Sequence, residues 1–188
     1  MHAALLRYLA VVLAVGLCLV AWGGLVAEQA EEEEAPATYV GQKKCKMCHS
    51  DIFAAWEKTV HAHAIDSLDD EAKANKMCLS CHTTGYGEEG GFVDLESTPQ
   101  MVNVQCEACH GAGSNYWNAS VMKDRELAIS KGLIIPPGPE VCVKCHNERS
   151  PEFTGFDYEE YVASPEGIHM IEKETGEEAQ EEKKEKGK

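Results

Sequence analysis

The alternation of apolar and charged stretches divides the chain into an apolar start, a mixed middle and a charged end. Residues 9–20 form an almost unbroken apolar run, residues 31–34 are consecutive glutamates, and residues 176–188 consist mainly of Glu and Lys. Charge runs of this kind stay solvated and do not pack into a core. We therefore predict one folded domain over residues 41–175, preceded by an acidic linker at 28–40 and followed by a charged tail that we expect to be disordered.

The mixed middle shows few regular elements. Residues 50–60 predict a helix, because a Ser-Asp cap is followed by apolar residues at helical spacing. Residues 85–91 form a glycine-rich turn, residues 92–95 are a candidate short strand, and residues 136–139 (Pro-Pro-Gly-Pro) predict a rigid elbow. Since neither long helices nor a sheet are visible, we predict a mostly α fold with long loops.

The apolar run at the start resembles a secretory signal peptide. Arg7 provides a positive charge ahead of the run, and Leu25-Val26-Ala27 before Glu28 resembles a cleavage site. An uncleaved anchor is the alternative, because the run approaches the shortest length that spans a bilayer. We expect residues 1–27 to be a signal peptide and the protein to be exported, to the periplasm or beyond the cell, with no other membrane segment.

A Cys-x-x-Cys-His motif that occurs four times is the dominant chemical feature. In this motif two thiols bond covalently to the porphyrin of a c-type haem, and the His becomes an axial ligand of the iron. The cysteines predicted to hold haem are Cys45, Cys48, Cys78, Cys81, Cys106, Cys109, Cys142 and Cys145. The iron ligands within the motifs are His49, His82, His110 and His146. We therefore predict four covalently attached haem c groups.

The cysteine count agrees with haem attachment. Eight of the nine cysteines belong to the motifs, and the ninth, Cys18, lies in the apolar N-terminal run. Two structural zinc sites built from the same Cys pairs are the alternative, but they would leave four adjacent His without a role. Because four haems would share a single domain-sized chain, we predict a multihaem c-type cytochrome fold whose core is built largely from the haems.

The second axial position of each iron is less determined by the sequence. The chain has eight His, of which four belong to motifs and one, His2, belongs to the signal. The remaining candidates for distal ligands are His61, His63 and His169. Three candidates cannot fill four positions, so at least one haem lacks a second His from its own chain. The methionines that could serve instead are Met101, Met122 and Met170, although such residues more often pack in a core.

Stretches around the first and third motifs follow the pattern of a known family. The matching residues are Gly41-Gln42-Lys43-Lys44-Cys45, Trp56, Thr59, His61-Ala62, Ala64, Gly85-Tyr86-Gly87, Gly90-Gly91-Phe92 and Cys106-Glu107-Ala108-Cys109-His110-Gly111-Ala112-Gly113. On these residues the chain resembles the tetrahaem cytochrome c-554 type, from about residue 41 to residue 146. The resemblance implies helices around closely stacked haem pairs and a role in electron transfer. It also implies that His61 is a distal ligand of the third haem and His169 of the fourth.

One position departs from the pattern of that family. The family has a distal His shortly after the third motif, where this chain has Ser120. The resemblance therefore implies that the first haem finds another ligand. His63, Met122 and a His from a neighbouring subunit of a haem filament are the possibilities.

The strongly negative net charge of the chain limits the kinds of molecule that it can bind. The formal net charge of −15 argues against nucleic acid and anionic lipid, and favours redox proteins with basic docking surfaces. We predict a carrier of single electrons between redox partners outside the cytoplasm, rather than an enzyme. The alternatives are a filament protomer that shares a His between subunits and an oxidoreductase of small nitrogen compounds with one open haem. The latter lacks a visible acid–base cluster, since Arg125 and Arg149 are scattered.

Overall fold

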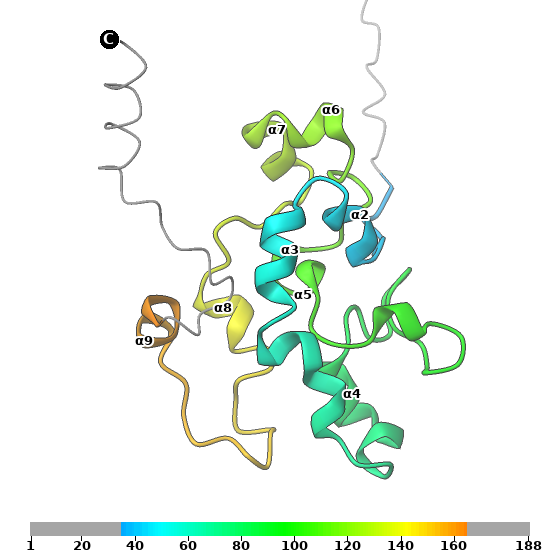
Figure 1. Cartoon of the computed structure of the whole chain (residues 1–188), viewed down its shortest axis with the longest axis vertical. Helices are drawn as coiled ribbons and strands as arrows, with labels where there is room; N and C mark the ends of the chain where they lie inside the picture. The colour runs from blue at the N-terminus through cyan, green and yellow to red at the C-terminus, as the bar shows by residue number, and fades with distance from the viewer. Residues whose placement is uncertain (1–34, 165–188) are drawn as a thin grey trace, which may run out of the picture. The chain divides into compact units, whose positions relative to one another are not determined.

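Short helices joined by loops make up the protein in a computed structural model that describes residues 35–164 (Figure 1). In chain order they are α2 (Gln42–Lys46), α3 (Ser50–Trp56), η1 (Val60–Ser67), η2 (Ala72–Ala74), α4 (Lys76–His82), η3 (Pro99–Met101), α5 (Cys106–His110), α6 (Ala119–Met122), α7 (Arg125–Ser130), α8 (Pro139–Cys142) and α9 (Tyr158–Ala163). No strand forms among the described residues, where one isolated antiparallel bridge joins Thr83 to Val102. The predicted mostly α class with long loops is confirmed.

Polar side chains determine where several helices begin. Asn75 accepts a hydrogen bond from the backbone N–H of Met77 at the start of α4, and Asp124 accepts one from Leu127 at the start of α7. These caps satisfy N–H groups that the first turn of a helix leaves unpaired. Helices this short are not stable on their own, so their contacts with the rest of the fold hold them in place.

The helix predicted over residues 50–60 begins as expected but ends early. Helix α3 starts at Ser50 and stops at Trp56. The Thr59 hydroxyl donates a hydrogen bond to the carbonyl oxygen of Trp56 at 2.8 Å, and Thr59 itself is extended. A local hydrogen bond of this kind competes with the helical pattern. Val60 therefore lies outside the helix, with 78% of its surface exposed.

The strand predicted at residues 92–95 is wrong. The Asp94 carboxylate accepts a hydrogen bond from the backbone N–H of Ser97 at 2.6 Å, and the Thr98 hydroxyl accepts one from Val93 at 2.8 Å. Asp and Thr side chains that bond the backbone nearby favour turns over strands. The segment therefore closes into a turn.

The proline-rich elbow predicted at residues 136–139 leads directly into α8, which begins at Pro139.

Two small apolar clusters form the protein core of the described residues. One contains Phe53, Trp56 and Ala62, and the other contains Leu79, Phe92 and Met101. Three buried side chains per cluster are few for a chain of this length. This thin core supports the prediction that cofactors complete it.

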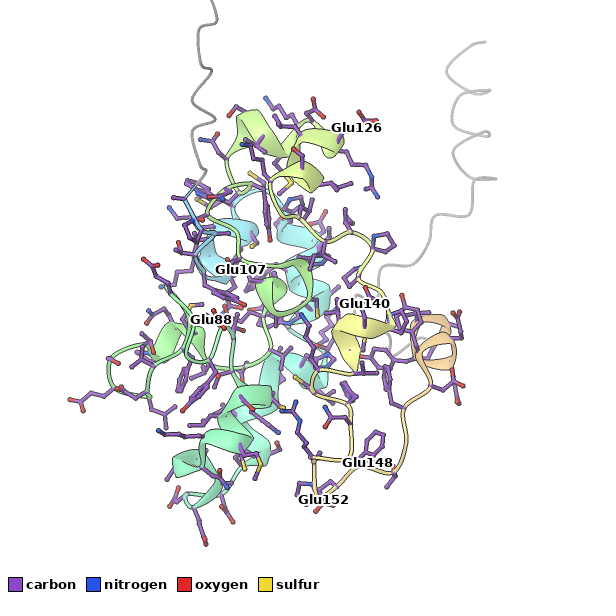
Figure 2. All side chains as sticks on the ribbon, turned by 180° about the vertical axis from the view of Figure 1, so that it is seen from behind. Glu88, Glu107, Glu126, Glu140, Glu148 and Glu152 are labelled. Carbon is purple, nitrogen blue, oxygen red and sulfur yellow. The ribbon has the colours of Figure 1, made fainter. Side chains whose placement is uncertain are left out.

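A buried carboxylate joins the start of the fold to the loop after the third motif. Glu107 of α5 is 2% exposed, and Figure 2 shows it inside the fold, whereas Glu126 and Glu152 project outward. Its oxygens accept backbone hydrogen bonds from Val40 at 2.9 Å and from Gly41 and Gly113 at 2.7 Å. Glu107 therefore links the segment just before α2 to the loop that follows α5.

The folded part begins before the expected boundary at residue 41. The backbone N–H of Thr38 donates to the Ser114 hydroxyl at 2.8 Å, and the N–H of Ser114 donates to the Thr38 carbonyl at 3.1 Å. Residues 38–40, which the charge pattern assigned to the linker, are thus bound to the loop after α5. The local composition of residues 38–40 cannot show that they pair with a loop far along the chain.

Several predictions fall outside the described residues. These are the signal or anchor at residues 1–27, the start of the linker, the tail at residues 176–188, and the positions of Cys18, His169 and Met170. Among the helices that are described, none has both the length and the apolar character needed to cross a bilayer.

Candidate haem sites

Each motif lies on a short helix or at the end of one. The second and third motifs lie entirely within α4 and α5, whereas the first and fourth begin in the last turn of α2 and α8. Helical backbone brings side chains three positions apart to the same face, so the two cysteines of a motif can bind one porphyrin. None of the eight motif cysteines forms a disulfide, so each is available to bond to a porphyrin.

Two motif histidines are held in the tautomer that iron ligation requires. Nδ1 of His82 lies 2.6 Å from the carbonyl oxygen of Ala64, and Nδ1 of His110 lies 2.8 Å from that of Ile134. Because a carbonyl can only accept, Nδ1 carries the proton and Nε2 keeps its lone pair. Metal-binding histidines are commonly oriented by such a carbonyl contact. The residues present therefore fit a haem at these motifs.

Cysteines of different motifs meet in the fold. Cys45 of the first motif hydrogen-bonds with Cys106 of the third, and this bond raises the pKa of the Cys45 thiol. Burial, and then the neighbouring Cys81 of the second motif, raises the pKa of Cys145 in the fourth motif to about 12. The first motif thus adjoins the third, and the second adjoins the fourth.

The third and fourth motifs also lie close enough for their thiols to affect each other. Burial, and then the neighbouring Cys142 of the fourth motif, raises the pKa of Cys109 in the third motif to about 11. The contacts therefore connect the motifs in the order first, third, fourth, second. These raised pKa values keep the buried thiols uncharged at neutral pH.

His61 lies beside the His of the fourth motif. The ring centroids of His61 and His146 are 5.9 Å apart, with an interplanar angle of 85°. Two imidazoles on opposite sides of one iron, each with a bond of about 2 Å, would have their centroids roughly 6 Å apart. Burial, and then His146, lowers the pKa of His61, which favours the neutral form that a metal binds. This placement favours the fourth haem as the partner of His61, whereas the resemblance implies the third.

His63 is directed toward solvent. Its side chain is 63% exposed, its Nε2 lies 3.0 Å from the carbonyl oxygen of Glu57, and its Nδ1 lies 3.5 Å from the Asp66 carboxylate. Both ring nitrogens are thus engaged by neighbours at the surface. This placement argues against the expected role of His63 as a distal ligand.

The small residues after the third motif serve a purpose that the sequence did not reveal. A Cβ atom at Gly113 would lie 2.9 Å from Oε1 of Glu107 and 3.0 Å from Cγ2 of Val40. Gly113 is therefore required for the close approach of its own N–H to the Glu107 carboxylate.

The alternative of structural zinc finds no site in the described residues. Nowhere in residues 35–164 do three or more His, Cys, Asp or Glu side chains converge in a way that could hold a metal ion. Haem attachment needs instead one thiol pair and one His at each motif.

Comparisons with known proteins point to one family. A family model described as cytochrome c554 and c-prime matches residues 44–111, a range that includes the first three motifs but not the fourth. Cytochrome c-554 from Nitrosomonas europaea is 32% identical over 122 residues, which cover 56% of this chain and 51% of that protein. The match thus spans about half the length of this relative.

A solved structure agrees with the sequence comparisons. The reduced state of cytochrome c554 from Nitrosomonas europaea is 27% identical, with a TM-score of 0.57. The alignment covers 79% of this chain and 98% of the solved one. The similarity in three dimensions therefore extends beyond the segment that the family model matches.

Proposed function

We propose that this chain, which is similar to cytochrome c554 in sequence and in structure, is a multihaem cytochrome that carries single electrons between redox proteins outside the cytoplasm. The observation that carries the proposal is the similarity to cytochrome c554, which covers 79% of this chain in three dimensions. The cysteines of different motifs also lie near one another. Each bound haem would supply an iron that gains or loses one electron. Haems held in the order first, third, fourth, second would form one continuous path.

The chain supplies the iron ligands that this role needs. His49, His82, His110 and His146 would each bind the iron of their own motif. His61 would be the second ligand of the fourth haem, as its distance from His146 supports. His169 remains a proposed distal ligand, and with His61 on the fourth haem it becomes available to another one.

Electron paramagnetic resonance of the oxidised protein, with and without nitric oxide, tests the proposal together with a redox titration. We expect low-spin signals to dominate and most of the reduction to occur at low potential, because a haem with two His ligands lacks the potential-raising effect of Met. Potentials that all lie well above zero would contradict electron carriage of this kind. A nitric-oxide-sensitive haem with turnover of nitrite or hydroxylamine would favour the enzyme instead.

The number of haems can be counted directly. We expect four haems per chain in the wild type, by pyridine haemochrome assay and intact mass, because four complete motifs are present. The double variant Cys142→Ser with Cys145→Ser should carry three, since both thiols of the fourth motif are lost. A wild type that already carries three would show that the fourth motif, which the family model does not cover, is not loaded.

The acidic charge predicts how the protein reacts with small redox partners. With a formal net charge of −15, the electron-transfer rate with a cationic complex should fall as salt is added, whereas that with an anionic complex should rise. Stopped-flow measurements at several ionic strengths test this. Equal salt dependence for both complexes would argue against the proposed preference for basic docking partners.

A further inference from the structure

A cavity beside the first motif is lined by Met122, whose thioether sulfur could bind iron. The cavity has a volume of about 190 Å³, and the residues that line it include Cys45, Cys48 and His49 of the first motif. Ala119 and Met122 of α6 line the same cavity. A thioether therefore shares a cavity with the thiols and the His that would hold the first haem.

The described histidines do not serve this cavity. His61 lies beside His146 of the fourth motif, and His63 faces solvent with both nitrogens engaged. Among the described lining residues, His49 is the one imidazole, and it belongs to the motif itself. A second ligand for the first haem must therefore be another kind of side chain, unless it comes from outside the described residues.

The neighbouring polar side chains of the cavity are committed elsewhere. Glu107 accepts hydrogen bonds from three backbone N–H groups. The Tyr116 hydroxyl bonds the carbonyl oxygens of His110 at 3.1 Å and Gly111 at 2.5 Å. Nζ of Lys44 lies 4.3 Å from the centroid of the Trp117 ring, where a cation–π contact holds it. Lys123 lines the cavity as well, so Met122 is the uncommitted lining side chain that offers an uncharged donor to iron at neutral pH.

The register of α6 explains why Met122, rather than Ser120, is presented. Asn118 caps the helix by accepting hydrogen bonds from the backbone N–H of Ser120 at 3.0 Å and from its hydroxyl at 3.1 Å. Ala119 and Met122 are three positions apart, so they lie on one face of the helix, and both line the cavity. Ser120 lies on another face and is exposed.

We propose that Sδ of Met122 is the second axial ligand of the haem held by the first motif, opposite His49. This inference rests on the proposed attachment of haem to Cys45 and Cys48. A Met ligand raises the potential of a haem relative to a second His. The first haem would therefore have a higher potential than a haem with two His ligands.

Spectroscopy of the oxidised and reduced protein tests this ligand in the wild type itself. A Met–iron bond gives a weak far-red charge-transfer band in the ferric state and a strongly shifted methyl resonance of the ligated Met in proton spectra of the ferrous state. We expect both signals, at the intensity of one haem. Their absence from a wild type that carries four haems would overturn the inference while leaving the proposed function intact.

Substitutions assign the signals to a residue. Met122→Leu should abolish both signals and create one high-spin haem, whereas Met122→His should restore the low-spin state at a lower potential. Met47→Leu is the matched control, because Met47 lies within the first motif but is 66% exposed and does not line the cavity. Persistence of the signals in Met122→Leu would overturn the inference. A haem count below four in the wild type would count against the proposed function instead.

Discussion

His61→Leu is expected to convert one low-spin haem into a high-spin haem. Leucine keeps much of the buried volume of the imidazole but has no lone pair for iron, so the iron beside His146 would lose its second ligand. Electron paramagnetic resonance should show a new high-spin signal equal to about one haem per chain, with a matching loss of low-spin intensity. The haem count should remain that of the wild type.

His63→Leu is the matched control for this prediction. His63 is two positions away but lies at the surface, where Glu57 and Asp66 engage its nitrogens, so the spectrum should not change. The third and fourth haems can be separated by adding His61→Leu to the variant that lacks Cys142 and Cys145. In that background His61→Leu should have no further spectral effect. A new high-spin signal in that background would indicate that His61 binds the iron of the third haem.

The attachment residues could be proposed from the sequence alone because the haem motif is local. Two thiols and a His within five positions are sufficient for the chemistry, and one helical turn brings them together at Cys78–His82 and Cys106–His110. The start of α3 was equally local, since its cap and its first apolar residues are neighbours in the chain. Features of this kind do not depend on the rest of the fold.

The distal ligands were harder to predict because they depend on long-range placement. Nothing near His61 in the sequence indicates that its ring packs beside His146. The sequence could not show whether His61 or His63 faces inward. The cavity that Met122 shares with Cys45 and His49 likewise unites segments that are far apart in the chain. Met122 was therefore one of three candidate methionines until the fold placed it.

Glu107 was missed because its partners are backbone groups. It occupies a variable position of the third motif, where the sequence suggests no structural role. The groups that bind it, the N–H of Val40, Gly41 and Gly113, carry no side-chain signature. The one available signal was an acidic residue inside a motif that Gly-x-Gly follows. The structure gives that pattern its reason, because Gly113 makes room for the carboxylate.

Glu107→Gln is expected to destabilise the haem-loaded protein by about 3 kcal/mol, because hydrogen bonds to a charged acceptor stabilise by roughly 1.5–3 kcal/mol and a buried donor left unpaired costs about 1–3 kcal/mol. Three backbone N–H groups share the two carboxylate oxygens. Glutamine keeps the shape but turns one oxygen into an NH₂ group, which would face the Gly41 N–H or the Gly113 N–H. Denaturant unfolding followed by haem absorbance measures the difference.

Glu152→Gln provides the control for the loss of one negative charge. Glu152 is exposed in a loop, so its substitution should change the free energy of unfolding by less than about 0.5 kcal/mol.

Because Glu107 lies within the third motif and binds the segment just before the first motif, the Glu107→Gln substitution should also loosen the contact between Cys45 and Cys106. We therefore expect Glu107→Gln to weaken the coupling between the first and third haems. A variant as stable as the wild type would mean that the segment before α2 is held without this carboxylate.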